Sequence, residues 1–120
     1  MTKIAVVGTH GAGKSTLCYQ LASFFKSKGG NVDIIQERIR FSPFPFNEKM
    51  TKETALWGYH AQILRELESL AKGFNVVICD RSAMDYFFYA EYFKISDLHI
   101  NILKQISTLW MDSYDLIIIV

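Results

Sequence analysis

The residues with the clearest chemical meaning lie at positions 8–16, where the sequence is GTHGAGKST. Gly8, Gly13, Lys14 and Ser15 have the G-x-x-x-x-G-K-S spacing of a phosphate-binding loop. Glycines let main-chain N–H groups approach a polyanion closely, and a helix that begins near Lys14 points its positive end at the same place. The lysine adds a charge for the β- and γ-phosphates, and the serine hydroxyl suits one coordination position of Mg²⁺.

This stretch therefore predicts a site for a nucleoside triphosphate with its Mg²⁺. The alternative is a glycine-rich turn between a strand and a helix that binds nothing. The residues predicted to bind the nucleotide are Gly8, Thr9, His10, Gly11, Ala12, Gly13, Lys14, Ser15 and Thr16.

A second group of candidates follows the apolar run at positions 76–79. Asp80 ends this run, and a carboxylate at the end of a buried strand is the usual partner of a phosphate loop, because Mg²⁺ needs an anionic oxygen nearby. We therefore predict that Ser15 and Asp80 hold the metal, with a turn or capping role for Asp80 as the alternative. Arg81 suits a transferring phosphoryl group or the acceptor, since its planar fork matches phosphate. The alternative for Arg81 is a surface salt bridge.

Glu37 is the candidate that favours a kinase. It follows an apolar strand at 32–36, and ligands bind at the carboxyl edge of open α/β sheets. A carboxylate there can orient an acceptor hydroxyl and accept its proton. The alternative is an exposed Glu37 paired with Arg40, which otherwise binds the phosphate or sugar of an acceptor. The candidate catalytic residues are Lys14, Glu37, Asp80 and Arg81, and those for the acceptor are Glu37, Arg40 and Arg81.

The elements that must position these side chains alternate along the chain. Short apolar runs predict strands at 3–7, 32–36, 75–79 and 116–120. Helical periodicity predicts helices at 14–28, 51–72, 83–93 and 96–111. Ser82 and Asp85 form a capping box that explains them better than ligand contact does. Strands that alternate with helices indicate a parallel sheet covered on both faces.

The same periodicity predicts which helical side chains face inward. Gln62 and Arg65 are expected to be solvated, although they could contact an acceptor base. The phenylalanines of the FSPFPF loop at 41–46 are expected to cover the second helix or, alternatively, to stack with Trp57 on an acceptor ring. The inward-facing residues are predicted to be Leu17, Leu21, Phe24 and Phe25; Leu56, Tyr59 or His60, Ile63, Leu67 and Leu70; and Leu103, Ile106 and Trp110.

Composition limits the function further. The 120 residues suggest one domain, and a net charge of +1 without a basic run argues against nucleic acid as a partner. No apolar run approaches the length of a membrane span, and the N-terminus does not resemble a signal peptide. Cys18 and Cys79 are expected to be buried thiols in a reducing setting. We therefore expect a cytoplasmic protein; its oligomeric state is left open.

Taken together, GTHGAGKSTL, Glu37-x-x-Arg40 and DRSAMDYFFYA resemble the AAA-type ATPase/kinase domain similar to ribosylnicotinamide kinase. More broadly, the chain resembles the nucleoside and nucleotide kinases of the P-loop superfamily. The resemblance implies a three-layer α/β/α fold with a parallel sheet of order 2-3-1-4, together with ATP, Mg²⁺ and a small-molecule acceptor. Such kinases carry a further strand, an adenine-contacting loop and an arginine-bearing lid after this point. We therefore expect residues 1–120 to be a nucleotide-binding domain truncated at its C-terminus, which alone turns over little.

Three functions agree with these residues. The first is a kinase that passes the γ-phosphoryl of ATP to a nucleoside- or nucleotide-like acceptor. The second is a regulatory ATPase, and the third is a nucleotide-binding module without chemistry. Glu37 and Arg40 favour the first.

Overall fold

The structure, a computed structural model, describes residues 1–9 and 13–120. Its centre is a four-stranded parallel sheet in the order β2-β3-β1-β4, which confirms the predicted order 2-3-1-4. In this register Ala5 lies opposite Cys79 and Val6 opposite Asp80, so β1 and β3 end side by side. The strands are β1 (Thr2–Val7), β2 (Val32–Ile35), β3 (Val76–Asp80) and β4 (Leu116–Ile119).

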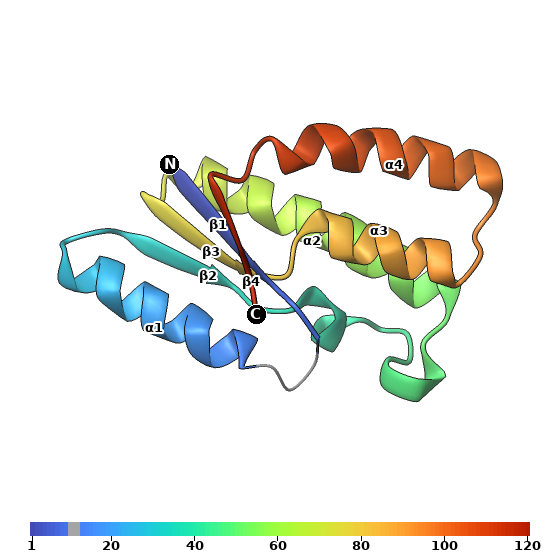
Figure 1. Ribbon diagram of the computed structural model, residues 1–120, viewed down its shortest axis with the longest axis horizontal. Helices are drawn as coiled ribbons and strands as arrows, with labels where there is room; N and C mark the ends of the chain where they lie inside the picture. Colours follow the sequence, from blue (N-terminus) through green and yellow to red (C-terminus); the bar gives the residue numbers. More distant parts are fainter. Residues whose placement is uncertain (10–12) are drawn as a thin grey trace.

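Helices cover both faces of the sheet, as the alternating pattern predicted (Figure 1). The helix α1 lies on one face, and α2, α3 and α4 lie on the other. Two short 3-10 turns, η1 (Arg38–Phe41) and η2 (Asn47–Lys49), lie between β2 and α2. The helices are α1 (Lys14–Ser27), α2 (Lys52–Ala71), α3 (Ala83–Tyr92) and α4 (Asp97–Met111).

The alternation of side chains along β3 divides the core into two layers. Val76 and Ile78 pack toward α1, whereas Val77 and Cys79 pack on the opposite face. Continuous apolar strands of this kind are typical of a parallel sheet buried on both sides. Cys18 and Cys79 are both buried free thiols, as expected.

Side chains cap three helices at their first turns. The Thr51 hydroxyl accepts a hydrogen bond from the Thr54 amide at the start of α2. The Ser96 hydroxyl accepts from the His99 amide at the start of α4. The Ser82 amide donates to the Asp85 carboxylate at 2.7 Å, which confirms the predicted capping box of α3.

The buried face of α2 differs from the predicted one. Leu67 and Leu70, predicted to face inward, are 45% and 55% exposed. Polar side chains take their place because each finds hydrogen-bond partners inside the protein, which makes their burial tolerable. The buried residues of α2 are Thr54, Ala55, Gly58, Tyr59, Gln62, Glu66 and Ser69.

The expected solvation of Gln62 and Arg65 was also wrong. Gln62 is fully buried. Arg65 is partly buried and forms a two-pronged ion pair with Asp33 of β2 at 2.7 and 2.9 Å. This pair joins α2 to β2, the strand that leads to Glu37.

Two further inward assignments were wrong. Phe24 of α1 is 54% exposed, because α1 turns the small side chains of Cys18 and Ala22 toward the sheet, with Leu17 and Leu21 beside them as predicted. Ile106 of α4 is 41% exposed. In α4, Ser107 faces inward instead, and its hydroxyl lies 2.8 Å from that of Tyr59.

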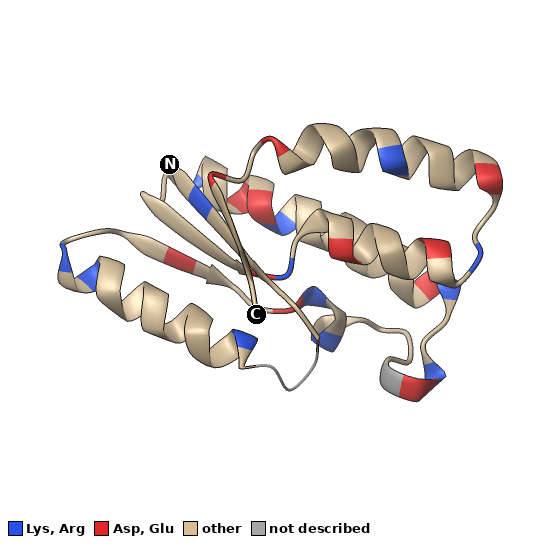
Figure 2. Ribbon diagram, in the orientation of Figure 1, with Lys and Arg blue, Asp and Glu red and all other residues tan. Residues whose placement is uncertain are grey.

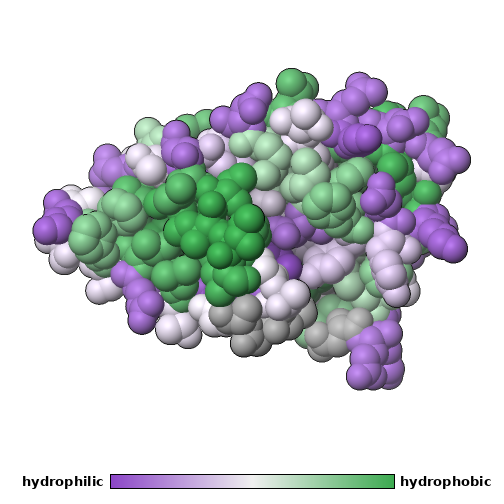
Figure 3. Space-filling view, viewed as in Figure 1, coloured by the Kyte–Doolittle hydropathy of each residue, from purple (hydrophilic) through white to green (hydrophobic). Residues whose placement is uncertain are grey.

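The surface mixes charge and apolar character. Acidic and basic residues both occur along α2 and α4, whereas α1 carries only basic residues and α3 only acidic ones (Figure 2). An apolar area lies over β4 in Figure 3, where Leu116 is 51% exposed and Ile119 is 81% exposed. In the part of the chain that the structure describes, no helix has both the length and the apolar character to cross a membrane.

Candidate functional site

The phosphate loop lies between the carboxyl end of β1 and the first turn of α1. Gly13 precedes the helix with a φ of 85°, a left-handed conformation that favours glycine. Gly8 has a φ of 151°, and a Cβ there would lie 2.7 Å from the Val120 carbonyl oxygen. The predicted residues Thr9, Ser15 and Thr16 belong to the same segment, whereas His10, Gly11 and Ala12 lie outside the described residues.

Lys14 is held by the loop itself. Its side chain is buried, and Nζ donates a hydrogen bond to the Thr9 carbonyl oxygen at 2.9 Å. The ammonium therefore already points along the loop in which a polyanion would lie. A bound phosphate oxygen would replace the Thr9 carbonyl oxygen as the acceptor of the hydrogen bond from Lys14 Nζ.

Ser15 and Asp80 lie together, as predicted. The Ser15 hydroxyl donates to Oδ2 of Asp80 at 2.8 Å, although the two residues are 65 positions apart. Asp80 is 4% exposed, and within the described part of the chain its Oδ1 has no hydrogen-bond partner. A buried anionic oxygen without a donor is costly, and a cation would satisfy it. The donor set, one hydroxyl and one carboxylate, fits the few protein ligands that Mg²⁺ takes beside phosphates.

Glu37 and Arg81 form a buried ion pair. Arg81 Nε donates to Glu37 Oε1 at 2.8 Å, and both side chains are 3% exposed. Arg40 approaches the other Glu37 oxygen at 3.6 Å from the solvent side. Burial acts to lower the pKa of the Arg81 guanidinium, but the charge and hydrogen bond of Glu37, together with Tyr89 and Asp85, outweigh burial and raise that pKa. The alternative for Glu37, an exposed side chain paired with Arg40, was therefore wrong about the exposure of Glu37. The alternative for Arg81, a surface salt bridge, was wrong because its ion pair is buried.

The backbone at Arg81 is unusual. Its φ is 90°, which is rare outside glycine. Its amide donates to the Val6 carbonyl at 3.0 Å, and its guanidinium lies 3.5 Å from the Gly8 carbonyl and over the Tyr89 ring. One residue thus contacts β1, the start of the phosphate loop and Glu37.

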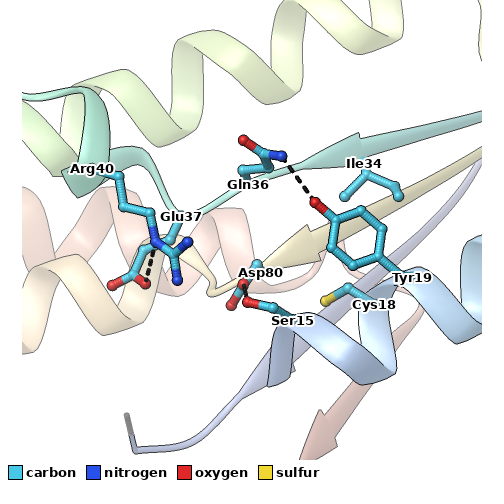
Figure 4. Close-up of a pocket in the computed structure, with 8 residues that line it drawn as sticks. All are labelled: Ser15, Cys18, Tyr19, Ile34, Gln36, Glu37, Arg40 and Asp80. Carbon is cyan, nitrogen blue, oxygen red and sulfur yellow. Dashed lines mark hydrogen bonds and ion pairs between the residues drawn. The ribbon is translucent and has the colours of Figure 1, made fainter. Parts of the chain in front are cut away.

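A cleft of about 340 Å³ brings most of the predicted groups together, although the buried Arg81 is not among its lining residues. Glu37 and Arg40 lie on one side of it, and Ser15 and Asp80 on the other (Figure 4). The residues that line the cleft are Gly13, Lys14, Ser15, Thr16, Glu37, Arg40 and Asp80. The arrangement places the candidate phosphate-binding residues, the candidate metal ligands and a second carboxylate around one space.

A recess beside this cleft contains residues that the sequence did not single out. Gln36 Nε2 donates to the Tyr19 hydroxyl at 3.0 Å across the recess (Figure 4). Cys18 and Ile34 also line it. The signal was present in helical spacing, because Cys18 and Tyr19 follow Ser15 by three and four positions and share its face of α1. Burial, and then the Asp80 charge, raises the pKa of the Cys18 thiol to about 12, so it lines the recess as a neutral group.

The phenylalanines of the loop at 41–46 do not lie where stacking on an acceptor ring would require them. Phe41 is 55% exposed, and Phe44 and Phe46 are each 40% exposed. The set of residues lining the cleft includes none of them. The Arg38 guanidinium instead stacks over Phe41, 4.6 Å from the ring centre.

The chain matches a known protein family over nearly its whole length. A family model described as an AAA domain matches residues 3–120. No curated protein matches the chain significantly. P-loop AAA domains generally bind nucleotide together with Mg²⁺, so the match and the loop geometry both indicate nucleotide binding.

Proposed function

The chain belongs to the AAA domain family of P-loop proteins, and on this premise we propose that it is a kinase. Its substrates are ATP and a small nucleoside- or nucleotide-like acceptor with a free hydroxyl. The reaction moves the γ-phosphoryl group of ATP to the acceptor oxygen.

The observation that supports phosphotransfer is the position of Glu37. Its carboxylate lines the same cleft as Lys14, Ser15 and Asp80, at the carboxyl edge of β2. Nucleotide binding alone requires the phosphate loop and Asp80, but it does not require a second carboxylate across the cleft. A carboxylate held in place by Arg81 and Arg40 is suited to orient a hydroxyl.

In the proposed mechanism, the loop amides and Lys14 bind the β- and γ-phosphates, and Nζ exchanges the Thr9 carbonyl for a phosphate oxygen. Ser15 and Asp80 would hold Mg²⁺, which supplies positive charge to the phosphate oxygens. Glu37 accepts a hydrogen bond from the acceptor hydroxyl. A bond forms between that oxygen and the γ-phosphorus while the bond to the β,γ-bridging oxygen breaks, and ADP leaves. The hydroxyl proton passes to Glu37 and then to solvent.

The test measures ADP release from Mg·ATP by the full-length protein, with and without a panel of nucleosides and mononucleotides. Stimulation by one acceptor is the expected result. Release that does not depend on any acceptor would instead support a regulatory ATPase. No release at all, despite ATP binding, would support a binding module.

A pair of lysine variants checks that the observed activity comes from this site. Lys14→Ala should weaken ATP binding and abolish ADP release, because it removes the charge that faces the phosphates. Lys26→Ala removes the same charge from an exposed position near the end of α1 and should change neither. Calorimetry with ATP and Mg²⁺ measures the binding.

A further inference from the structure

A buried polar cluster lies between the sheet and helices α2 and α4, away from the cleft. Its centre is the Glu66 carboxylate, which is 2% exposed. Oε1 accepts hydrogen bonds from Lys3 Nζ at 2.6 Å and Trp110 Nε1 at 3.0 Å. Oε2 accepts from the Tyr114 hydroxyl at 2.6 Å and Gln62 Nε2 at 2.7 Å. We call these five residues the Glu66 cluster.

Two members of the Glu66 cluster also hold the backbone that follows Asp80. Gln62 Nε2 donates to the Arg81 carbonyl at 3.3 Å. The Tyr114 hydroxyl accepts from the Ala83 amide at 3.0 Å. The cluster therefore contacts this turn at two points, from α2 and from the segment before β4.

The orientation of Gln62 indicates that these contacts determine its position. Its Nε2 lies between two acceptors, Glu66 and the Arg81 carbonyl, so the amide nitrogen must point toward them. Its Oε1 is buried and has no hydrogen-bond partner among the described residues. A glutamine that leaves a buried acceptor unpaired is a poor choice for stability alone.

The turn itself needs support. Arg81 has a φ of 90°, and a non-glycine residue keeps such a conformation only where its surroundings hold it. The Arg81 amide is fixed by Val6, and its carbonyl by Gln62. The same residue carries the guanidinium that pairs with Glu37.

The ion pair in the Glu66 cluster also indicates a role other than stability. Lys3 and Glu66 form an ion pair whose side chains are 5% and 0% exposed. Lys3 Nζ also lies 4.6 Å from the ring centres of Trp110 and Tyr114. Desolvating two charges often costs more than their attraction returns, so an apolar packing would serve stability equally well.

We propose that Gln62 and Tyr114 are positioning residues that act through Arg81. They fix the backbone of the turn, the turn fixes the guanidinium, and the guanidinium holds the Glu37 carboxylate toward the cleft. This inference deepens the proposed function, on which its kinetic consequence rests. Its structural part can be measured without any turnover.

The first measurement is hydrogen exchange of the Arg81 Nε–H by ¹H–¹⁵N NMR, with the signal assigned through Arg81→Lys. Gln62→Met and Tyr114→Phe each remove one hydrogen bond to the turn at nearly constant side-chain size. We expect each variant to raise this exchange rate about fivefold, as loss of one hydrogen bond implies. Backbone amides of β1 and β3 in the same samples report any global loss of stability.

Tyr59→Phe is the matched control. It removes another buried phenol hydroxyl, one that contacts Ser107 and the Leu103 carbonyl between α2 and α4. The Tyr59 hydroxyl makes no contact with the turn after Asp80 in the described structure. Tyr59→Phe should therefore leave the exchange rate of the Arg81 Nε–H unchanged relative to the backbone amides.

The proposal is overturned if Tyr114→Phe and Gln62→Met change the Arg81 Nε–H exchange no more than Tyr59→Phe does. It is also overturned if exchange at β1 and β3 rises by the same factor. Where kinase turnover is observed, both variants should lower kcat about fivefold and leave KM for ATP unchanged. A faster Nε–H exchange in a protein without kinase activity would uphold the positioning role and reject the proposed function.

Discussion

Replacing Glu37 by glutamine removes one charge from the buried pair with Arg81 while the side chain keeps its size. The pair has a length of 2.8 Å, and both side chains are 3% exposed, so water cannot replace the lost partner. Arg40 lies at 3.6 Å, but its side chain is 59% exposed, so it keeps its hydration without Glu37.

The magnitude follows from these contacts. Breaking a buried ion pair by removing one partner costs about 3–5 kcal/mol. The glutamine carbonyl can still accept the Arg81 Nε–H, which retains about 1 kcal/mol. The exposed Arg40 contact contributes less than about 1 kcal/mol. We therefore expect Glu37→Gln to lower the free energy of unfolding by about 2–4 kcal/mol, which a domain with about 5–15 kcal/mol of stability survives.

Urea unfolding followed by circular dichroism measures this loss, and calorimetry and ADP release measure function on the same samples. ATP affinity should stay within about threefold, because the phosphate loop is untouched. Acceptor-stimulated ADP release should fall about 100-fold or more, since the carboxylate that orients the hydroxyl is gone. Glu48→Gln makes the same change at an exposed position and should alter none of the three.

A double-mutant cycle with Arg81→Met isolates the pair itself. The coupling energy between positions 37 and 81 should be about 2 kcal/mol or more. A loss of stability below 1 kcal/mol in Glu37→Gln, or an additive cycle, would show that the pair does not hold the site. Full acceptor-stimulated turnover in Glu37→Gln would remove the catalytic role of the carboxylate.

Three shorter predictions concern other parts of the molecule. A Cβ at Gly58 would lie 2.8 Å from the Tyr86 ring. Gly58→Ala should therefore lower the free energy of unfolding by about 1–3 kcal/mol through overpacking, partly offset by about 1 kcal/mol of helix propensity. The melting temperature should fall by a few degrees. Although burial would raise it, hydrogen bonds led by Arg65 hold the pKa of Asp33 below its usual range. The stabilisation from this lowered pKa is present above the ordinary value of about 3.9 and is lost as pH falls through the lower folded pKa. At pH 7, Asp33→Asn should therefore have a free energy of unfolding about 1–2 kcal/mol below that of the unmodified protein. Urea titrations should show that this difference becomes smaller below about pH 4. Asp80→Asn should weaken ATP binding at least about tenfold in Mg²⁺ and not at all in EDTA, as calorimetry can show.

The parts of the site that the sequence predicted are those fixed by local spacing and by strand topology. Gly8 and Lys14 belong to one loop, so their relation depends on a few residues. Asp80 is distant in sequence, but any parallel sheet in which its strand neighbours β1 brings it to Ser15. The apolar runs located the two strand ends, and the strand order that the family resemblance implied placed Asp80 beside Ser15.

The buried polar groups were not predictable in the same way. Hydropathy periodicity placed Leu67 and Leu70 of α2 inward and left Gln62 for solvent, and it gave no reason to single out Glu66. The structure reverses this because Gln62 and Glu66 have partners on other elements, and hydropathy contains no information about distant partners. The same reason explains why the sequence suggested the neighbouring Arg40 as an alternative partner of Glu37 and did not reveal Arg81.

The order of the strands has a consequence for how the protein is made. β1 is synthesised first, yet its two neighbours in the sheet, β3 and β4, come from the second half of the chain. On the ribosome, β1 and α1 must therefore wait for partners that have not yet been translated, and such distant pairings form slowly. A ligand stabilises only a form that can bind it, so a nucleotide cannot assist the nascent chain until β3 has emerged and docked.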